Sequence, residues 1–181
     1  MPQPAVFLDR DGTLIEDLGV LSDPSQIHLF DYTLPALAEM GRHYLLFVVT
    51  NQNGIATGQI TFDQARAVNA ALDEILRRGG VSVRQWYVCP HHRDDGCACI
   101  KPNPTFLRQA ARDWDVDLRR SYVIGDHPHD AATADGVGAT GLYLLTGHGR
   151  QHQNELPPGR LVFDTLASAG EWLMRHKEGS E

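Results

Sequence analysis

Two aspartates two positions apart, Asp9 and Asp11, are the first residues of this chain whose types and spacing could do chemistry. They follow the short apolar run 5–8, which predicts a buried strand that carries Asp9 to its carboxyl end. Gly12 comes next and allows the backbone to turn tightly and to approach a ligand closely. The pattern favours a reactive carboxylate pair at a strand end over the alternative, a polar Asp-Gly turn without chemistry.

Polar and charged residues also follow three later apolar runs. They are Thr50, Asn51, Gln52 and Asn53 after the run 44–49, Lys101 beyond the run 83–88, and Asp126 and Asp130 after the run 121–125. Because the carboxyl ends of parallel strands meet at one edge of a sheet, we expect these side chains to share a crevice with the first two aspartates. Several acids in one crevice repel each other unless a cation lies between them, and carboxylate, carbonyl and water oxygens are the ligands of Mg²⁺. Taken singly, the same residues would also fit turns, helix caps or a solvated lysine.

Apolar runs alternate with helical patterns along the chain. The expected strands are 5–8, 44–49, 83–88, 121–125, 141–145 and 161–163, and the expected helices are 33–42, 61–78, 105–114, 129–135 and 165–176. This alternation predicts an α/β fold with an open, doubly wound parallel sheet and helices on both faces. We expect the first strand to be central, with strands two and three on one side and four and five on the other.

Residues 14–32 show no sustained period and are expected to form a loop over the active edge. No interval in the sequence is long enough for a large cap domain. Residues 1–181 are therefore predicted to form a single domain.

Three cysteines and a histidine lie close together in the predicted loop 89–101. They are Cys89, His91, Cys97 and Cys99. Three thiolates and one imidazole are enough to close a tetrahedral structural Zn²⁺ site, which would hold the loop that presents Lys101. The alternatives are a redox-active cysteine pair or a chance cluster, and His92 could compete with its neighbour as the imidazole ligand.

Acidic residues outnumber basic ones by 23 to 16, which gives a net charge of −7. This balance disfavours a nucleic-acid partner or an anionic membrane surface, whereas a small anionic substrate fits if a local cation neutralises it. No stretch approaches the roughly 20 apolar residues of a membrane span, and residues 1–4 lack the basic start of a signal peptide. Because its three cysteines are clustered and cannot form a distributed disulfide framework, the chain is expected in a reducing, cytoplasmic compartment. The sequence does not determine the oligomeric state, for which a monomer is the expectation.

Four segments together resemble a known family of enzymes. They are residues 7–13 around the two aspartates, 49–55 around Thr50, 89–92 with the first Cys-x-His, and 97–102 with Cys-x-Cys-x-Lys-Pro. The combination is similar to the D-glycero-D-manno-heptose 1,7-bisphosphate phosphatases and the related histidinol-phosphate phosphatases of the haloacid dehalogenase superfamily. The resemblance covers residues 6–149 and implies the Rossmann-like fold of that superfamily.

The resemblance also implies roles for the residues at the predicted crevice. Asp9 would be the nucleophile that forms an aspartyl-phosphate, and Asp11 the general acid and base. The carboxylates of Asp9 and Asp126 and the backbone carbonyl of Asp11 would hold Mg²⁺, with Asp130 supporting them. The substrate phosphates and sugar would be contacted by the loop 17–20 and by Thr50, Asn51, Gln52, Asn53, Lys101 and His127.

This chain departs from the family pattern where the substrate is recognised. Ile100 stands where an arginine is usual, Thr57 where a basic residue is frequent, and His127 where a lysine is common. Losing a guanidinium removes bidentate recognition of phosphate. Heptose bisphosphate, histidinol phosphate and another small phosphate monoester therefore all stay open as substrates. The chain carries no basic stripe interleaved with aromatics, which disfavours a polynucleotide 3′-phosphatase.

Two further predictions concern a non-catalytic alternative and the C-terminal part of the chain. A non-catalytic interaction module built on the zinc loop is harder to reconcile with the complete set of acids and the lysine. Beyond residue 149 no motif is interpretable, and His148 and His152 are expected to be surface histidines rather than ligands.

Overall fold

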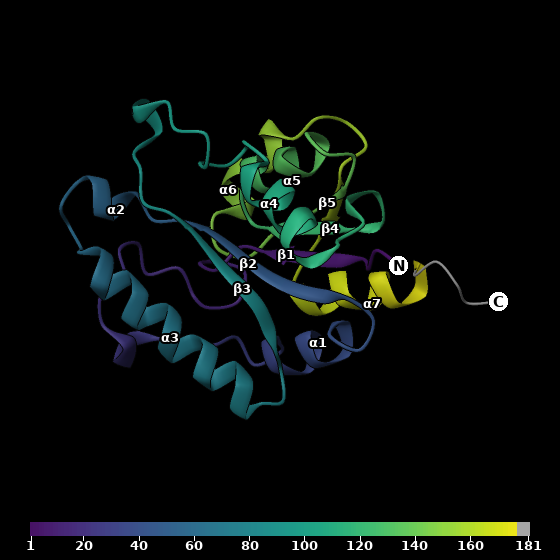
Figure 1. The fold of residues 1–181 in the computed structure, drawn as a ribbon, viewed down its shortest axis with the longest axis horizontal. Helices are drawn as coiled ribbons and strands as arrows, with labels where there is room; N and C mark the ends of the chain where they lie inside the picture. The colour runs from purple at the N-terminus through teal and green to yellow at the C-terminus, as the bar shows by residue number, and fades with distance from the viewer. Residues whose placement is uncertain (177–181) are drawn as a thin grey trace.

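The computed structural model describes residues 1–176 as strands and helices that alternate around one sheet (Figure 1). The strands are β1 Ala5–Leu8, β2 Leu45–Asn51, β3 Val83–Cys89, β4 Tyr122–Gly125, β5 Thr140–Leu144 and β6 Leu161–Phe163. The helices are α1 Thr33–Met40, α2 Asn53–Ala56, α3 Phe62–Arg78, α4 Thr105–Trp114, α5 Pro128–Asp135, α6 Gly149–His152 and α7 Leu166–His176.

The six strands pair in parallel in the order β3-β2-β1-β4-β5-β6. β1 is central, and its residue Leu8 lies opposite Val48 of β2 and Ile124 of β4. The chain builds one half of the sheet outward from β1 and then returns to build the other half from β4. The carboxyl ends of β1 and β4 therefore flank a crevice, as in other doubly wound sheets. The predicted α/β fold and the order of its first five strands are confirmed.

Helices cover both faces of the sheet because successive side chains of a strand point to opposite sides. Val6 and Leu8 of β1 pack with buried residues of α1, α3 and α7. Ala5 and Phe7 pack with buried residues of α4 and α5 on the other face. Figure 1 shows α1, α3 and α7 on one side of the sheet and α4, α5 and α6 on the other.

Helix α3 begins where the sequence places its cap. The Thr61 hydroxyl accepts a hydrogen bond from the backbone N–H of Gln64, and the Gln64 side chain accepts one from the backbone N–H of Thr61. This reciprocal arrangement satisfies two of the free N–H groups at a helix start. The buried face of α3 is apolar except for Asn69, which is only 6% exposed. An amide on such a face requires a polar partner from outside the helix.

The structure differs from the sequence prediction in several local features. The expected helix 33–42 ends at Met40, and the second strand continues two residues past the expected end at 49. Helices α2 and α6 lie in segments with no predicted helix, because four residues are too few for a periodic signal. Residues 14–32 form a loop as expected, although Leu14 and Ile15 are fully buried in the core.

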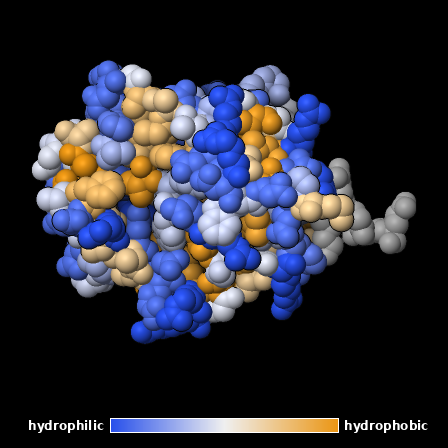
Figure 2. All heavy atoms as spheres, viewed as in Figure 1, coloured by the Kyte–Doolittle hydropathy of each residue, from blue (hydrophilic) through white to orange (hydrophobic). Residues whose placement is uncertain are grey.

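The surface is mixed in character. On the face drawn in Figure 2, hydrophilic side chains cover most of the area and hydrophobic residues lie in smaller groups between them. Such an arrangement is ordinary for a globular domain. Within residues 1–176, none of the helices combines the length and the apolar composition that crossing a membrane requires.

Candidate active site

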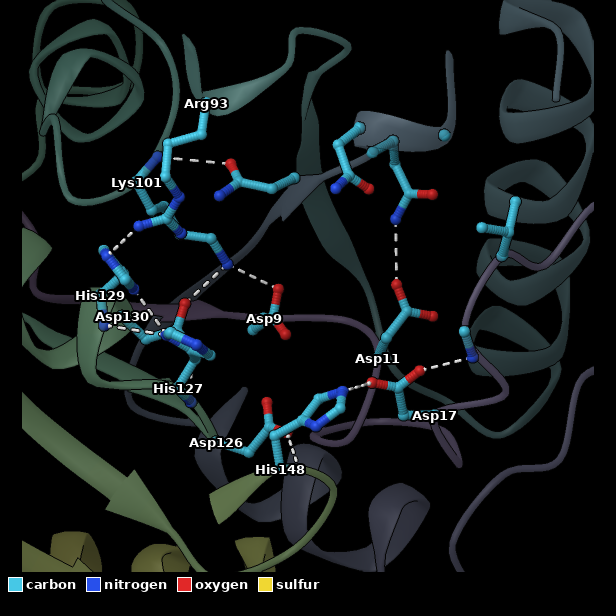
Figure 3. A pocket seen from close by; sticks show the side chains of 16 residues that line it. Asp9, Asp11, Asp17, Arg93, Lys101, Asp126, His127, His129, Asp130 and His148 are labelled. Carbon is cyan, nitrogen blue, oxygen red and sulfur yellow. Dashed lines mark hydrogen bonds and ion pairs between the residues drawn. The ribbon is translucent and has the colours of Figure 1, made fainter. Parts of the chain in front are cut away.

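A cavity of about 310 Å³ opens at the carboxyl edge of the sheet. Its lining combines five aspartates with three amide side chains, one lysine, one arginine and three histidines. Figure 3 shows that the carboxylates of Asp9 and Asp126 and the amine of Lys101 come together from different strands and loops. The structure thus brings the ends of β1 and β4 and the loop after β3 to one site, as the sequence predicts.

Lys101 joins two carboxylates at the floor of the cavity. Its Nζ lies 2.6 Å from Asp9 Oδ1 and 2.6 Å from Asp130 Oδ1, and it donates a 3.0 Å hydrogen bond to the carbonyl of Val49. Burial disfavours the charge of Lys101, but the carboxylates of Asp130 and Asp9 outweigh burial and raise the pKa of its ammonium group. The lysine is therefore a permanent buried cation beside Asp9.

The remaining negative charge at this site exceeds what one lysine can neutralise. Burial raises the pKa of Asp9 to about 6 against the opposing effect of Lys101. Burial, together with the charges of Asp9 and Asp130, raises the pKa of Asp126 to about 8. One oxygen from each of these three aspartates lies within 4.8 Å of the others. The raised pKa values mean that these carboxyl groups do not all ionise readily without a nearby positive charge. A hard divalent cation such as Mg²⁺ would supply that charge and bind their oxygens.

Two glycines hold the carboxylate of Asp126 in a close fit. A Cβ atom at Gly12 would lie 2.2 Å from Asp126 Oδ2, and one at Gly147 would lie 2.1 Å from it. Both glycines have positive φ, at 75° and 47°, which other residues rarely adopt. The backbone N–H of His148 also donates a 2.7 Å hydrogen bond to the same oxygen. Gly12, from the Asp-Gly pair noted in the sequence, therefore leaves the space that the carboxylate of Asp126 occupies after β4.

Asp11 is held by two neighbours. Arg10 contacts both of its oxygens through Nε and Nη2, with a shortest distance of 2.8 Å. Gln52 donates from Nε2 to Asp11 Oδ2 at 2.9 Å and to the Thr50 hydroxyl at 2.8 Å. Burial is the largest influence on the pKa of Asp11 and raises it, although Arg10 opposes the shift. Sequence reasoning left Arg10 without a role, and its only signal was a charge directly after a buried strand.

The segment after β2 places three amides at the cavity. Asn51, Gln52 and Asn53 line it, whereas Thr50 is buried and its hydroxyl accepts the Gln52 amide. Asn51 also accepts a 3.3 Å hydrogen bond from the backbone N–H of Lys101. The loop that carries the lysine is therefore fastened to the end of β2.

His127 and His129 line one wall of the cavity, and the ring of His152 packs against His127. The ring of His127 lies 4.5 Å from that of His129 and 4.8 Å from that of His152, measured between centroids. Arg93 approaches His129 from the opposite side, with 2.5 Å between Nη1 and Nε2. Burial, with the nearby His129 and His152, lowers the pKa of His127 to about 4. His127 is therefore neutral at pH 7.

His148 is exposed and His152 half-buried, and neither belongs to a candidate metal cluster of the described residues, in line with the sequence prediction, but both take part in contacts near the cavity. The His148 ring is half exposed but lines the cavity, and its Nε2 lies 2.9 Å from Asp17 Oδ2 (Figure 3). The His152 ring packs on His127. Both residues follow β5, and tertiary packing rather than any local motif brings His148 to the cavity and His152 against His127.

The predicted cysteine and histidine set also converges in space. Its three Sγ atoms lie 3.0 to 3.6 Å apart. His91 Nδ1 lies 3.3 Å from Cys99 Sγ and 3.8 Å from Cys89 Sγ. None of the three cysteines is in a disulfide. Four soft donors at these separations fit a tetrahedral ion of the size of Zn²⁺.

The raised pKa of Asp126 predicts how pH affects stability. A carboxyl group with a higher pKa in the folded state binds its proton more tightly there, so stability falls as pH rises from about 4 to about 8. We expect the melting temperature of the metal-free protein to fall from about pH 6.5 to 8 more steeply than that of Asp126→Asn, and saturating Mg²⁺ to reduce this fall. Calorimetry at both pH values measures the difference. Parallel slopes for the two proteins would contradict the prediction.

Comparison with known proteins places this site in a class. Residues 98–169 match the model of the HAD-hydrolase-like family. The D-glycero-beta-D-manno-heptose-1,7-bisphosphate 7-phosphatase of Vibrio cholerae serotype O1 is 34% identical over 98% of this chain and 100% of that protein. The enzyme of the same name from Bordetella bronchiseptica is 33% identical over 94% of this chain and 97% of that protein.

Solved structures agree with these relatives. The crystal structure of D,D-heptose 1,7-bisphosphate phosphatase from B. bronchiseptica, complexed with magnesium and phosphate, matches with a TM-score of 0.88 at 32% identity, over 96% of this chain and 99% of that one. The heptose bisphosphate phosphatase of Burkholderia thailandensis, 22% identical, shares the fold with a TM-score of 0.73 over 95% of this chain and 99% of that one.

The parallel sheet, the site at its carboxyl edge and these matches define a phosphatase of the haloacid dehalogenase superfamily. Within that superfamily, the chain belongs to the D-glycero-D-manno-heptose-1,7-bisphosphate phosphatase family. The resemblance read from the four sequence segments is thereby confirmed.

Proposed function

We propose that this protein is a Mg²⁺-dependent phosphatase that transfers the phosphoryl group of a small sugar phosphate to Asp9 and then to water. The observation that carries the proposal is the placement of Lys101, whose ammonium group lies 2.6 Å from Asp9 beside a cluster of buried carboxylates. A buried cation next to a nucleophilic carboxylate can neutralise an incoming phosphate and orient it for attack. The relative from B. bronchiseptica was crystallised with magnesium and phosphate, which supports the same chemistry here.

The residues divide the work in two steps. An Asp9 oxygen attacks phosphorus, the bond from phosphorus to the leaving oxygen breaks, and Asp11 gives its proton to that oxygen. Asp11 then takes a proton from water, and the resulting hydroxide attacks phosphorus, which releases phosphate and restores the Asp9 carboxylate. Lys101 and the amides after β2 would contact the phosphoryl oxygens.

Mg²⁺ would be held by the carboxylates of Asp9 and Asp126 and by the backbone carbonyl of Asp11. When bound, it supplies positive charge to the phosphoryl oxygens and to the nucleophile. Asp130 would keep Lys101 in place, because it pairs with the lysine and also accepts the backbone N–H of His127 at 3.0 Å.

The zinc site would be structural. Its loop is tied to the residues around Lys101, because the Asn103 amide donates a 3.1 Å hydrogen bond to the carbonyl of Cys97. Four protein ligands leave no open position for a reaction at the metal. We propose that the ion fixes this loop within a single-domain, cytoplasmic, monomeric enzyme, and a reducing compartment suits three free thiolates.

Mutation of one thiolate ligand tests this assignment. We expect the purified protein to carry one zinc ion per chain, and Cys99→Ser to lose it and to melt at a temperature lower by about 5 °C or more. Native mass spectrometry and calorimetry measure these effects. His92→Ala is the matched control, because His92 lies beside the cluster but outside it, and this variant should keep its zinc. Loss of zinc in His92→Ala with retention in His91→Ala would reassign the imidazole ligand.

The substrate we favour is D-glycero-D-manno-heptose 1,7-bisphosphate. The relatives named above carry that substrate in their names. Arg93 lines the same cavity as Asp9, and its guanidinium would be a donor to a second anionic group of the substrate. The family resemblance implies that an arginine is usual at the position of Ile100, so Arg93 would be the guanidinium available for bidentate contact. Histidinol phosphate, with one phosphate, is the alternative.

A substrate panel tests the proposal. Phosphate release is measured with heptose 1,7-bisphosphate, histidinol phosphate and several sugar and nucleoside monophosphates, with and without Mg²⁺. We expect the highest kcat/KM for the bisphosphate, and Arg93→Gln to lower it about tenfold for the bisphosphate but not for heptose 7-phosphate. A preference for histidinol phosphate would replace the substrate assignment. Absence of Mg²⁺-dependent release from every compound would reject the phosphatase proposal.

A further inference from the structure

Arg10 is an unusual buried charge. It lies between the two reactive aspartates in sequence, and its side chain is fully buried. An arginine cannot lose its proton inside a protein, so its charge must be compensated by partners. Asp11 from the same turn supplies the opposite charge, and Asn69 from α3 accepts a hydrogen bond from the guanidinium.

The contact between the Arg10 guanidinium and the Asp11 carboxylate is bidentate. Nε and Nη2 of Arg10 lie 2.8 to 3.1 Å from the two carboxylate oxygens of Asp11. A planar guanidinium in this arrangement fixes the direction of a carboxylate as well as its position. Only 16% of the Asp11 side chain is exposed, and Asp11 lines the cavity.

Asn69 fixes the arginine in turn. Its Oδ1 accepts a 2.7 Å hydrogen bond from Nη1 of Arg10, the one terminal nitrogen that does not contact Asp11. The two residues are 59 positions apart, and Asn69 is the buried polar residue on the otherwise apolar inner face of α3. Helix α3 therefore holds the guanidinium of Arg10 in a single orientation through Asn69.

We propose that Arg10, anchored by Asn69, is a positioning residue that aims the Asp11 carboxylate at the leaving oxygen. Gln52 completes the support from the other side, because its amide links Asp11 to Thr50 at the phosphate site. In Figure 3 the dashed line joins the Asp11 carboxylate to an amide donor rather than to Asp9. Asp11 is thus fixed apart from the nucleophile. The inference rests on the proposed function, since it assigns Asp11 the proton transfer.

Asn69 allows a test that leaves both aspartates and the arginine intact. Asn69→Leu keeps the approximate volume but removes the acceptor, whereas Asn69→Asp keeps an acceptor oxygen in place. Each variant is measured with a sugar phosphate, whose alkoxide leaving group needs a proton, and with p-nitrophenyl phosphate, whose leaving group is a stable anion. Calorimetry confirms that both variants are folded at the assay temperature.

We expect Asn69→Leu to lower kcat for the sugar phosphate by about 10 to 100-fold with little change in KM. The kcat for p-nitrophenyl phosphate should fall by less than about 3-fold, because that reaction draws little on general acid catalysis. Asn69→Asp should restore the wild-type kcat with the sugar phosphate.

The outcomes separate the inference from the function on which it rests. Equal losses with both substrates would show a structural effect and overturn the positioning role, as would an Asn69→Leu variant with wild-type kcat on the sugar phosphate. A wild-type protein that hydrolyses neither compound with Mg²⁺ would reject the proposed function itself.

Discussion

Replacing Asp9 by asparagine should reduce kcat by about 10⁵-fold or more, because an amide of the same shape cannot form the bond to phosphorus. The Asp9 carboxylate lies 2.6 Å from the Lys101 ammonium group, directly after the central strand β1. Phosphate release measures the loss of kcat, and rapid acid quenching tests whether phosphate becomes covalently bound to the protein. Wild-type protein should carry covalent phosphate after quenching, and Asp9→Asn should carry none.

Asp63→Asn is the matched control for this change. Asp63 is an exposed residue at the start of α3, and its carboxylate is 83% exposed. The same loss of one charge there should leave kcat unchanged. A loss of less than about 100-fold in Asp9→Asn would contradict the role of Asp9 as nucleophile, because removing a nucleophile costs far more than removing one hydrogen bond.

Replacing Lys101 by methionine should lower kcat/KM by about 10³-fold, the second large effect. The variant loses the cation that neutralises phosphate, and it leaves Asp9 and Asp130 as unpaired buried carboxylates. Losing one partner of a buried pair costs about 3 to 5 kcal/mol of stability, so calorimetry should also show a lower melting temperature. Saturating Mg²⁺ should recover part of this stability but little of the activity.

Arg66→Met provides the comparison for the loss of a positive side chain. Arg66 is on the exposed side of α3, and 75% of its side chain is exposed. Its replacement should change neither kcat/KM nor the melting temperature by a measurable amount. If Lys101→Met kept more than about a tenth of wild-type kcat/KM, the lysine would have no central part in phosphate binding.

The arrangement of strands was predictable because its causes are local. Each strand is a short apolar run that ends in polar residues, and the alternation with helices allows only a parallel sheet with crossovers. The same logic predicts that Asp9 and Asp126 lie at one edge of the sheet. The convergence of the cysteines and the histidine at residues 89–99 was predictable because they lie close in the sequence and match the donor types of a structural metal site.

The partners of the charged side chains could not be predicted from the sequence. Lys101 is 92 positions from Asp9 and 29 from Asp130, and no local pattern states that one amine will join both. His148 and His152 carry no motif, yet the packing after β5 brings His148 to the cavity and the His152 ring against His127.

By itself, then, the sequence predicted the α/β class, the order of the first five strands and the convergence of the candidate catalytic and metal-binding residues. Only the tertiary structure decided that Arg10 is buried, that Asn69 anchors it and that the pKa of Asp126 is high. The reason is physical. Periodicity and turn chemistry act between near neighbours in sequence, whereas burial and Coulomb interactions depend on which distant segments pack together.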